Sequence, residues 1–130
     1  MRVAIPSNDK STIFKHFGRT GGFVICDIEN QEITNSEYLE NTFTPHAPAM
    51  QKNNGNGHGH HHHGHNHNSI FVALADCDVI IAGGMGRRLY DEFLAREYKV
   101  FMTQENEIES ALNLLISNDL DNNPEAGCHH

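Results

Sequence analysis

The sequence predicts an α/β fold built on a five-stranded mixed sheet, and three observations support this prediction. The 130 residues are enough for one domain with a hydrophobic core. The second half of the chain alternates helical and strand patterns, which favours parallel strands with helices on the faces of the sheet. The first half reads as a strand, a polar loop and a β-hairpin. We therefore expect a small α/β sandwich with an antiparallel hairpin at one edge.

The first half contains three predicted strands. Residues 2–6 are apolar and end in a proline, which predicts a short buried strand. Residues 7–20 are polar and are expected to form a loop. The apolar run 23–28 and the segment 33–39 predict the hairpin. Residues 44–68 are rich in Pro, Asn, Gly and His, a composition that predicts a flexible insert without a packed core.

The second half begins with a short apolar run, 69–75, that we interpret as a helix. Residues 78–82 predict a buried strand, and a glycine-rich turn follows at 83–86. Apolar residues at helical spacing predict an amphipathic helix over 87–97. Residues 99–102 predict one more strand.

The last predicted element is an amphipathic helix that ends near residue 118. Thr103 is expected to be its N-cap, because a threonine hydroxyl can accept hydrogen bonds from the first helical N–H groups. The polar residues 119–130 predict a flexible tail. The predicted domain is therefore 1–118, interrupted by the insert.

Composition excludes several classes of function. The net charge is −8, with 9 basic and 17 acidic residues, whereas nucleic-acid and membrane-surface binding favour a basic face. No apolar run approaches the ~20 residues that span a bilayer, and no signal peptide is recognisable, so a cytoplasmic location is expected. The three cysteines contain no Cys-x-x-Cys pair, so the chain does not supply a four-cysteine cluster site.

Two predicted loops follow parallel strands and should lie at the same edge of the sheet. Ligands bind beyond the carboxyl ends of parallel strands in open α/β sheets, which here means loops 7–20 and 83–87. Five of the nine cations lie in segments 7–20 and 83–90, and Asp9 is the carboxylate of the first loop. These cations are Lys10, Lys15, Arg19, Arg87 and Arg88. We therefore expect an anion-binding site on an otherwise acidic protein.

The bend Gly83-Gly84-Met85-Gly86 precedes a predicted helix. Glycines allow backbone N–H groups to approach a ligand, and a helix N-terminus favours negative charge. A tight turn without a ligand remains the alternative for this bend. His16 is a candidate metal ligand, because an imidazole nitrogen can bind iron or molybdenum. The alternative is a loop histidine that hydrogen-bonds a neighbouring carbonyl.

A second group of candidate metal ligands is a histidine-rich run with seven histidines in the ten residues 58–67. These are His58, His60, His61, His62, His63, His65 and His67. Imidazoles at this density chelate nickel, copper, zinc or cobalt. Cys128 precedes two more histidines and could add a thiolate, whereas Cys26 and Cys77 lie in or beside apolar strands and are expected to be buried.

No motif for enzymatic catalysis is present. The sequence contains no Gly-x-Ser-x-Gly and no His-Glu-x-x-His, and the bend at 83–86 is not a Walker A loop, because no Lys-Ser/Thr follows it. We therefore expect a protein that is not an enzyme.

Three segments stand out together: Met1-Arg2-Val3-Ala4-Ile5-Pro6, His16-Phe17-Gly18-Arg19 and Val79-Ile80-Ile81-Ala82-Gly83-Gly84-Met85-Gly86. In this order they resemble the dinitrogenase iron–molybdenum cofactor biosynthesis family, which includes NifX-like carriers and the C-terminal domain of NifB proteins. The resemblance covers residues 1–118 apart from the insert. It implies a three-layer, ribonuclease H-like fold with strand order 3-2-1-4-5 and an antiparallel second strand. It also implies non-enzymatic binding of metal clusters, with His16 as the cluster ligand.

The leading hypothesis is a carrier or scaffold for an anionic iron–sulfur or molybdenum-containing cluster, bound transiently between donor and acceptor proteins. The expected binding residues are Lys10, Lys15, His16, Phe17, Gly18, Arg19, Gly83, Gly84, Met85, Gly86, Arg87 and Arg88. Two alternatives remain. One is storage or delivery of nickel, zinc or copper through residues 58–67, and the other is an enzyme that acts on a phosphorylated substrate in the same basic pocket.

Overall fold

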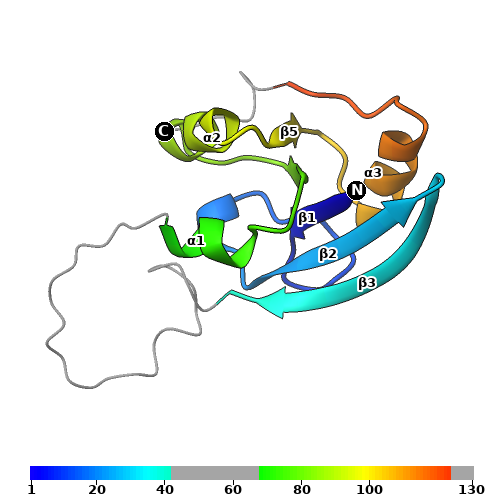
Figure 1. Ribbon diagram of the computed structural model, residues 1–130, viewed down its shortest axis with the longest axis horizontal. Coiled ribbons are helices and arrows are strands. Elements are labelled where there is room, and N and C mark those ends of the chain that lie inside the picture. Colours follow the sequence, from blue (N-terminus) through cyan, green and yellow to red (C-terminus); the bar gives the residue numbers. More distant parts are fainter. Residues whose placement is uncertain (42–67, 124–130) are drawn as a thin grey trace, which may run out of the picture.

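The computed structural model describes residues 1–41 and 68–123. These residues contain a five-stranded sheet with the order β3-β2-β1-β4-β5 (Figure 1). The strands are β1 (Arg2–Pro6), β2 (Gly22–Glu29), β3 (Glu32–Glu40), β4 (Val79–Ala82) and β5 (Lys99–Met102). β2 runs antiparallel to β1 and β3, whereas β4 runs parallel to β1 and β5. The predicted order and the antiparallel second strand are confirmed, while the likeness to ribonuclease H stays a prediction.

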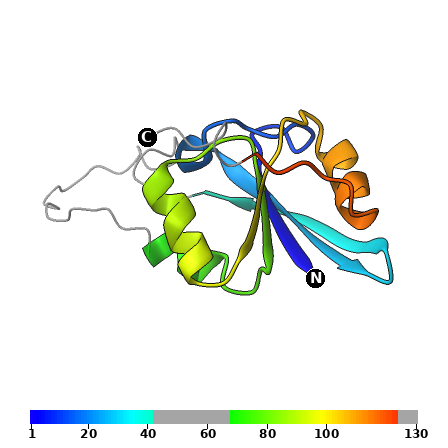
Figure 2. The same ribbon diagram turned by 90° about the horizontal axis from the view of Figure 1, so that it is seen from above.

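Helices cover both faces of the sheet (Figure 2). α1 (Asn68–Ala73) and α2 (Arg87–Ala95) pack on one face, where their apolar side chains join the larger core cluster. α3 (Ile108–Ile116) packs on the other face in a second cluster. Two helical layers with the sheet between them agree with the three layers expected from the sequence. Within the described residues, no helix has the length and apolar character needed to cross a membrane.

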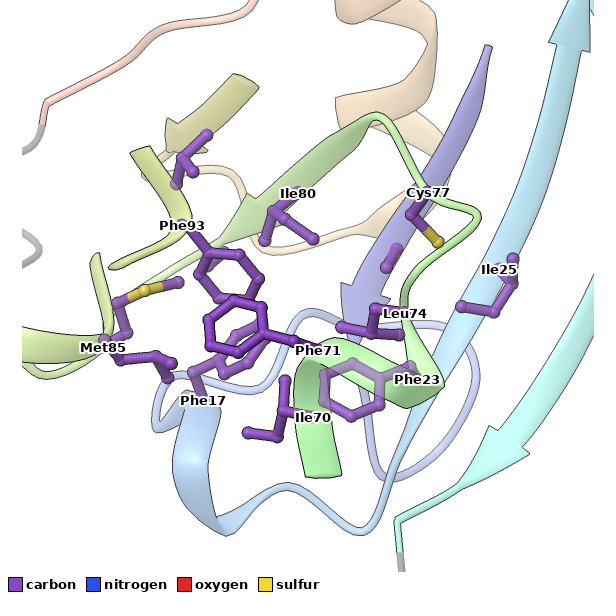
Figure 3. Close-up of a cluster of buried hydrophobic side chains, with 14 of the residues drawn as sticks. Phe17, Phe23, Ile25, Ile70, Phe71, Leu74, Cys77, Ile80, Met85 and Phe93 are labelled. Atoms are coloured by element: carbon purple, nitrogen blue, oxygen red, sulfur yellow. The ribbon is translucent and has the colours of Figure 1, made fainter. Parts of the chain in front are cut away.

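The larger core cluster contains a set of aromatic rings between the sheet and the α1/α2 layer (Figure 3). The Phe17 ring centroid lies 5.1 Å from that of Phe23 and 5.6 Å from that of Phe93. Phe71 of α1 contacts Phe93 of α2 at 4.8 Å in an edge-to-face arrangement. Phe17 comes from the loop after β1, so this loop is part of the core.

The connection from β5 to α3 differs from the prediction. α3 begins at Ile108 with Glu107 as its N-cap, so the expectation that Thr103 caps this helix was wrong. Thr103 is buried instead, and its hydroxyl donates a hydrogen bond to the Asp121 carboxylate. The same hydroxyl accepts a hydrogen bond from the Glu105 N–H at 3.0 Å. Thr103 therefore stabilises the turn after β5 rather than the start of the helix.

Residues 121–123, part of the segment 119–130 that the sequence analysis expected to be a flexible tail, bond to β5 and to the turn that follows it. The Met102 N–H donates to Oδ1 of Asn122 at 2.9 Å, and Nδ2 of Asn122 donates to the Val100 carbonyl at 3.1 Å. The Asn123 N–H donates to the Met102 carbonyl at 2.7 Å. These bonds occupy backbone groups that an edge strand would otherwise expose. The rest of the expected tail, 124–130, lies outside the described residues.

Candidate functional site

The loop after β1 and the bend after β4 meet at one edge of the sheet. β1 and β4 are parallel neighbours, so their carboxyl ends lie side by side, and the two segments leave the sheet together (Figure 2). The Phe17 N–H donates a hydrogen bond to the Gly84 carbonyl at 3.1 Å. The structure therefore joins the two segments that the sequence analysis selected.

The first turn of the loop is organised by Asp9. Its carboxylate accepts hydrogen bonds from the N–H groups of Thr12 at 2.8 Å and Ser11 at 2.9 Å, and from the Thr12 hydroxyl. These bonds favour the charged form and lower the pKa of Asp9 to about 2. The carboxylate of this loop is thus engaged by the turn itself.

The middle of the loop is held from both sides. The Phe14 N–H donates to the Pro6 carbonyl at 2.9 Å, close to the end of β1. On the α3 side, the Ile13 N–H donates to Asn106 and the Ile108 N–H donates to Ser11, both at 2.9 Å. The backbone before His16 is therefore fixed by bonds to two different parts of the fold.

His16 lies at the surface, next to the buried Phe17. It precedes a single 3₁₀ turn, η1 (Phe17–Arg19), which its backbone carbonyl closes by accepting from the Arg19 N–H at 2.9 Å. Among the described residues the imidazole makes no capping hydrogen bond to this turn. The His16 ring meets the half-buried Phe14 ring edge-on, with centroids 5.9 Å apart. The imidazole is thus exposed and positioned by an aromatic neighbour, which the sequence analysis did not select.

Phe17 and Met85 were expected among the binding residues, but the structure places both side chains in the core (Figure 3). Phe17 is fully buried and Met85 is only 4% exposed. Each side chain anchors the segment that carries it. Burial explains how these side chains hold the two segments in place, while contact with a ligand stays a prediction.

The predicted cations separate into two groups: four lie in residues 15–19 or in the first turn of α2, and Lys10 lies apart from them. The Lys15 side chain lies over the bend, with its Cδ atom 2.8 Å from where a Cβ on Gly83 would be. Arg87 and Arg88 are exposed in the first turn of α2, and Arg87 also forms an exposed ion pair with Asp91 at 3.6 Å. Arg19 is the exposed last residue of η1.

Lys10 belongs to the second group. Its ammonium lies over the Tyr38 ring, 5.1 Å from the centroid. It also lines a cavity of about 380 Å³ on the α3 side of the sheet, together with Val24 and Leu112. The structure therefore places Lys10 with β3 and α3, and not over the glycine bend as Lys15 is.

The bend leads directly into α2. Gly86 is the N-cap residue, with φ −66° and ψ 149°, and it has no side chain with which to bond the first helical N–H groups. Within residues 1–41 and 68–123, a Cβ added to Gly86 or to Gly18 would meet no atom within 4 Å. Gly84 is buried and contributes the carbonyl that bonds Phe17. As far as these residues are concerned, the space beside the N-terminus of α2 is open.

Metal-ligand candidates among the described residues are sparse. Within 1–41 and 68–123, no group of three or more His, Cys, Asp or Glu side chains is arranged to hold a metal ion. Cys26 and Cys77 are buried as expected, and burial raises the pKa of both thiols, that of Cys77 to about 11. The histidines of 58–67 and Cys128 lie outside the described residues.

One protein-family model matches most of this chain, and a sequence relative and solved structures are similar to it over nearly their whole length. A sequence model of the family described as "Dinitrogenase iron-molybdenum cofactor" matches residues 1–118. An uncharacterised protein of Methanocaldococcus jannaschii is 28% identical over 121 residues, which are 93% of this chain and 90% of that protein. The crystal structure of a protein called PH0822 has a TM-score of 0.68 at 27% identity and covers 95% of each chain. The apo form of the orange protein from Desulfovibrio gigas has a TM-score of 0.65 at 18% identity, with 99% of this chain and 96% of that chain covered, and shows the shared fold.

Proposed function

The chain belongs to the dinitrogenase iron-molybdenum cofactor family, and we propose that it is a non-enzymatic carrier or scaffold for an anionic metal–sulfur cluster or a precursor of one. The observation that carries this proposal is the junction of His16 with the glycine bend. The Phe17–Gly84 hydrogen bond joins the residue after the exposed His16 to the bend that leads into α2, a helix that begins with two arginines. Donor and acceptor proteins would be the partners of such a carrier.

The charges around this junction favour an anion. The N-terminus of α2 is the positive end of its helix dipole, and the first turn contains Arg87 and Arg88 but no acidic residue. Cations at this end of a helix repel the dipole, so a bound anion would relieve an unfavourable arrangement. Lys15 and Arg19 add positive charge from the loop side. On a protein of net charge −8, this local field would direct a negatively charged cargo to the surface formed by residues 15–19 and 83–88, which we call the mouth.

The space at the bend also suits a ligand rich in sulfide. Gly86 adopts a backbone conformation that any residue can adopt, and a Cβ there would enter open space. The fold therefore does not require a glycine at this position. A missing side chain lets cargo atoms approach the first N–H groups of α2, which lack a side-chain cap.

The donor set fits a cargo that is bound and then released. Among the described residues the mouth offers one imidazole, His16, while Cys26 and Cys77 are buried elsewhere. A single protein ligand, assisted by cations and backbone N–H groups, holds a cluster less permanently than a complete set of thiolates would. Such sparse ligation is consistent with transfer to an acceptor protein.

The proposal is tested by loading the protein without oxygen, either with tetrathiomolybdate or with ferrous iron and sulfide. The protein is purified without metal-affinity resin, and metal and sulfide are measured after gel filtration. His16→Ala is expected to lose most of the bound metal and sulfide, because it removes the proposed imidazole ligand. The variant should still fold, because the His16 side chain is exposed and its removal leaves the core intact. Deletion of residues 55–67 is the matched control and should keep the cargo. Full loading of His16→Ala would refute the proposal.

A second candidate is storage or delivery of divalent metal, which the seven histidines of residues 58–67 favour. It predicts the opposite pattern in equilibrium dialysis against nickel or zinc. Deletion of 55–67 would abolish binding of the divalent metal, and His16→Ala would leave it unchanged.

A further inference from the structure

The Lys15 side chain occupies the place that a side chain on Gly83 would fill. A Cβ on Gly83 would lie 2.8 Å from Cδ, 3.4 Å from Nζ and 3.6 Å from Cε of this lysine. None of the glycines in the described residues has a positive φ, so the backbone at 83 does not itself demand glycine. The absence of a side chain at this position is therefore explained by the room that it leaves for Lys15.

The backbone on either side of Lys15 is fixed, which directs the side chain onto the bend. The Phe14 N–H is bonded to the Pro6 carbonyl at 2.9 Å, and the Phe17 N–H is bonded to the Gly84 carbonyl at 3.1 Å. Phe17 is also fully buried. With residues 14 and 17 held in this way, the lysine stem crosses Gly83 and its ammonium remains at the exposed mouth.

We infer that Gly83 is a positioning residue that acts on the cargo through Lys15, by seating the lysine ammonium at the mouth before the cargo arrives. This inference rests on the proposed function. It changes the role expected for Gly83 from the sequence, which was to let backbone N–H groups approach a ligand. Lysine has a flexible four-carbon stem and a compact point charge. Because the lysine stem is already held against Gly83, it loses less conformational entropy when the cargo binds, and the anionic cargo meets a cation that is already in position.

The expected effect of Gly83→Ala follows from this geometry. The new methyl group would displace the lysine stem, which is flexible and exposed, and the backbone can accept alanine. Ordering one long side chain on binding weakens affinity by about two- to tenfold. Gly86→Ala is the reference variant: Gly86 belongs to the proposed site, so its alanine variant is allowed to weaken binding, but among the described residues a Cβ there meets no atom within 4 Å and does not touch Lys15.

The experiment is a double-mutant cycle, with the dissociation constant for tetrathiomolybdate measured by anaerobic titration. Gly83→Ala should weaken binding about two- to tenfold in the wild-type background. In the Lys15→Gln background it should have no further effect, because the two changes act through one side chain. Gly86→Ala should change the dissociation constant by the same factor in the wild-type and Lys15→Gln backgrounds, because Gly86 does not act through Lys15.

Two outcomes would overturn the inference. In the first, Gly83→Ala weakens tetrathiomolybdate binding as much in the Lys15→Gln background as in the wild-type background, so Gly83 does not act through Lys15. If His16→Ala still weakens binding in that case, the proposed function stands and only this inference fails. The other needs no cargo: NMR of the free wild-type protein should show nuclear Overhauser contacts between the Lys15 side chain and the Gly83 α-protons. Their absence from a folded wild-type spectrum would contradict the seating of Lys15 whatever the cargo is.

Discussion

Replacing Phe17 by alanine should destabilise the whole protein and release the loop that carries His16. The Phe17 side chain is fully buried, and its ring packs against Phe23 and Phe93 with centroids 5.1 and 5.6 Å away. Removing a buried phenylalanine from a core costs about 3–5 kcal/mol, through lost transfer energy and the cavity that remains. Proteins have only about 5–15 kcal/mol of total stability, so the variant should be marginally folded.

The free energy of unfolding is measured by urea denaturation, with Phe101→Ala as the control. Phe101 is a half-buried phenylalanine on the other face of the sheet, so its truncation should cost less. The milder Phe17→Leu variant keeps the fold for hydrogen exchange. Its amide at residue 17, bonded to Gly84 in the wild type, should exchange faster, while the amide of Ala4 in β1 stays protected. A loss below about 1 kcal/mol for Phe17→Ala would refute the claim that this side chain anchors the site.

Two further predictions concern the loop turn and the sheet edge. The folded-state pKa of Asp9 is lowered to about 2, so its contribution to stability is present above the unfolded pKa of about 3.9 and is lost as pH falls toward 2. Acid titration should therefore show the stability gap between wild type and Asp9→Ala narrowing below pH ~4, and a gap that widens on acidification would contradict this. Asn122→Ala removes two hydrogen bonds to the β5 backbone and should cost about 1–3 kcal/mol in urea denaturation. Asn113 is exposed on α3, so Asn113→Ala should leave the free energy of unfolding nearly unchanged. Equal losses of stability in the two variants would argue against a stabilising contact between Asn122 and β5.

Four of the five strands could be predicted because each is a short apolar run, whereas β3 is polar and largely exposed and was expected only as the hairpin partner of β2. The strand order was implied by the family resemblance and is confirmed by the structure. β4, Val79–Ala82, is fully buried and matches the apolar segment expected at 78–82. The meeting of the two loops followed once β1 and β4 were taken as neighbours, as the resemblance implied, because parallel neighbouring strands end at one edge. These features depend on local pattern and on a general rule of sheet topology.

The features that could not be predicted depend on single side chains that bond across the chain. Asn122 pairs with β5 through its amide, 20 residues from Met102, and no periodicity in the sequence signals such a contact. Thr103 has the chemistry of an N-cap, but its hydroxyl bonds Asp121 instead. Lys10 has φ 71°, an unusual value for lysine, and its ammonium lies over Tyr38, so charge alone did not reveal its position.

The loop that carries His16 is fixed by hydrogen bonds to the rest of the fold, and this limits how the proposed site can work. Its backbone is bonded to the end of β1, to the β5–α3 connection and to Gly84, and the Phe17 side chain fixes it in the core. Little conformational entropy is therefore left to be lost when a cluster arrives. Under the proposed function, affinity should depend on the donors and charges at the mouth, and one imidazole with a few exposed cations would give weak, salt-sensitive binding. A carrier with an ordered site and few ligands would accept and release its cargo without refolding, which is what the proposed transfer between two partner proteins requires.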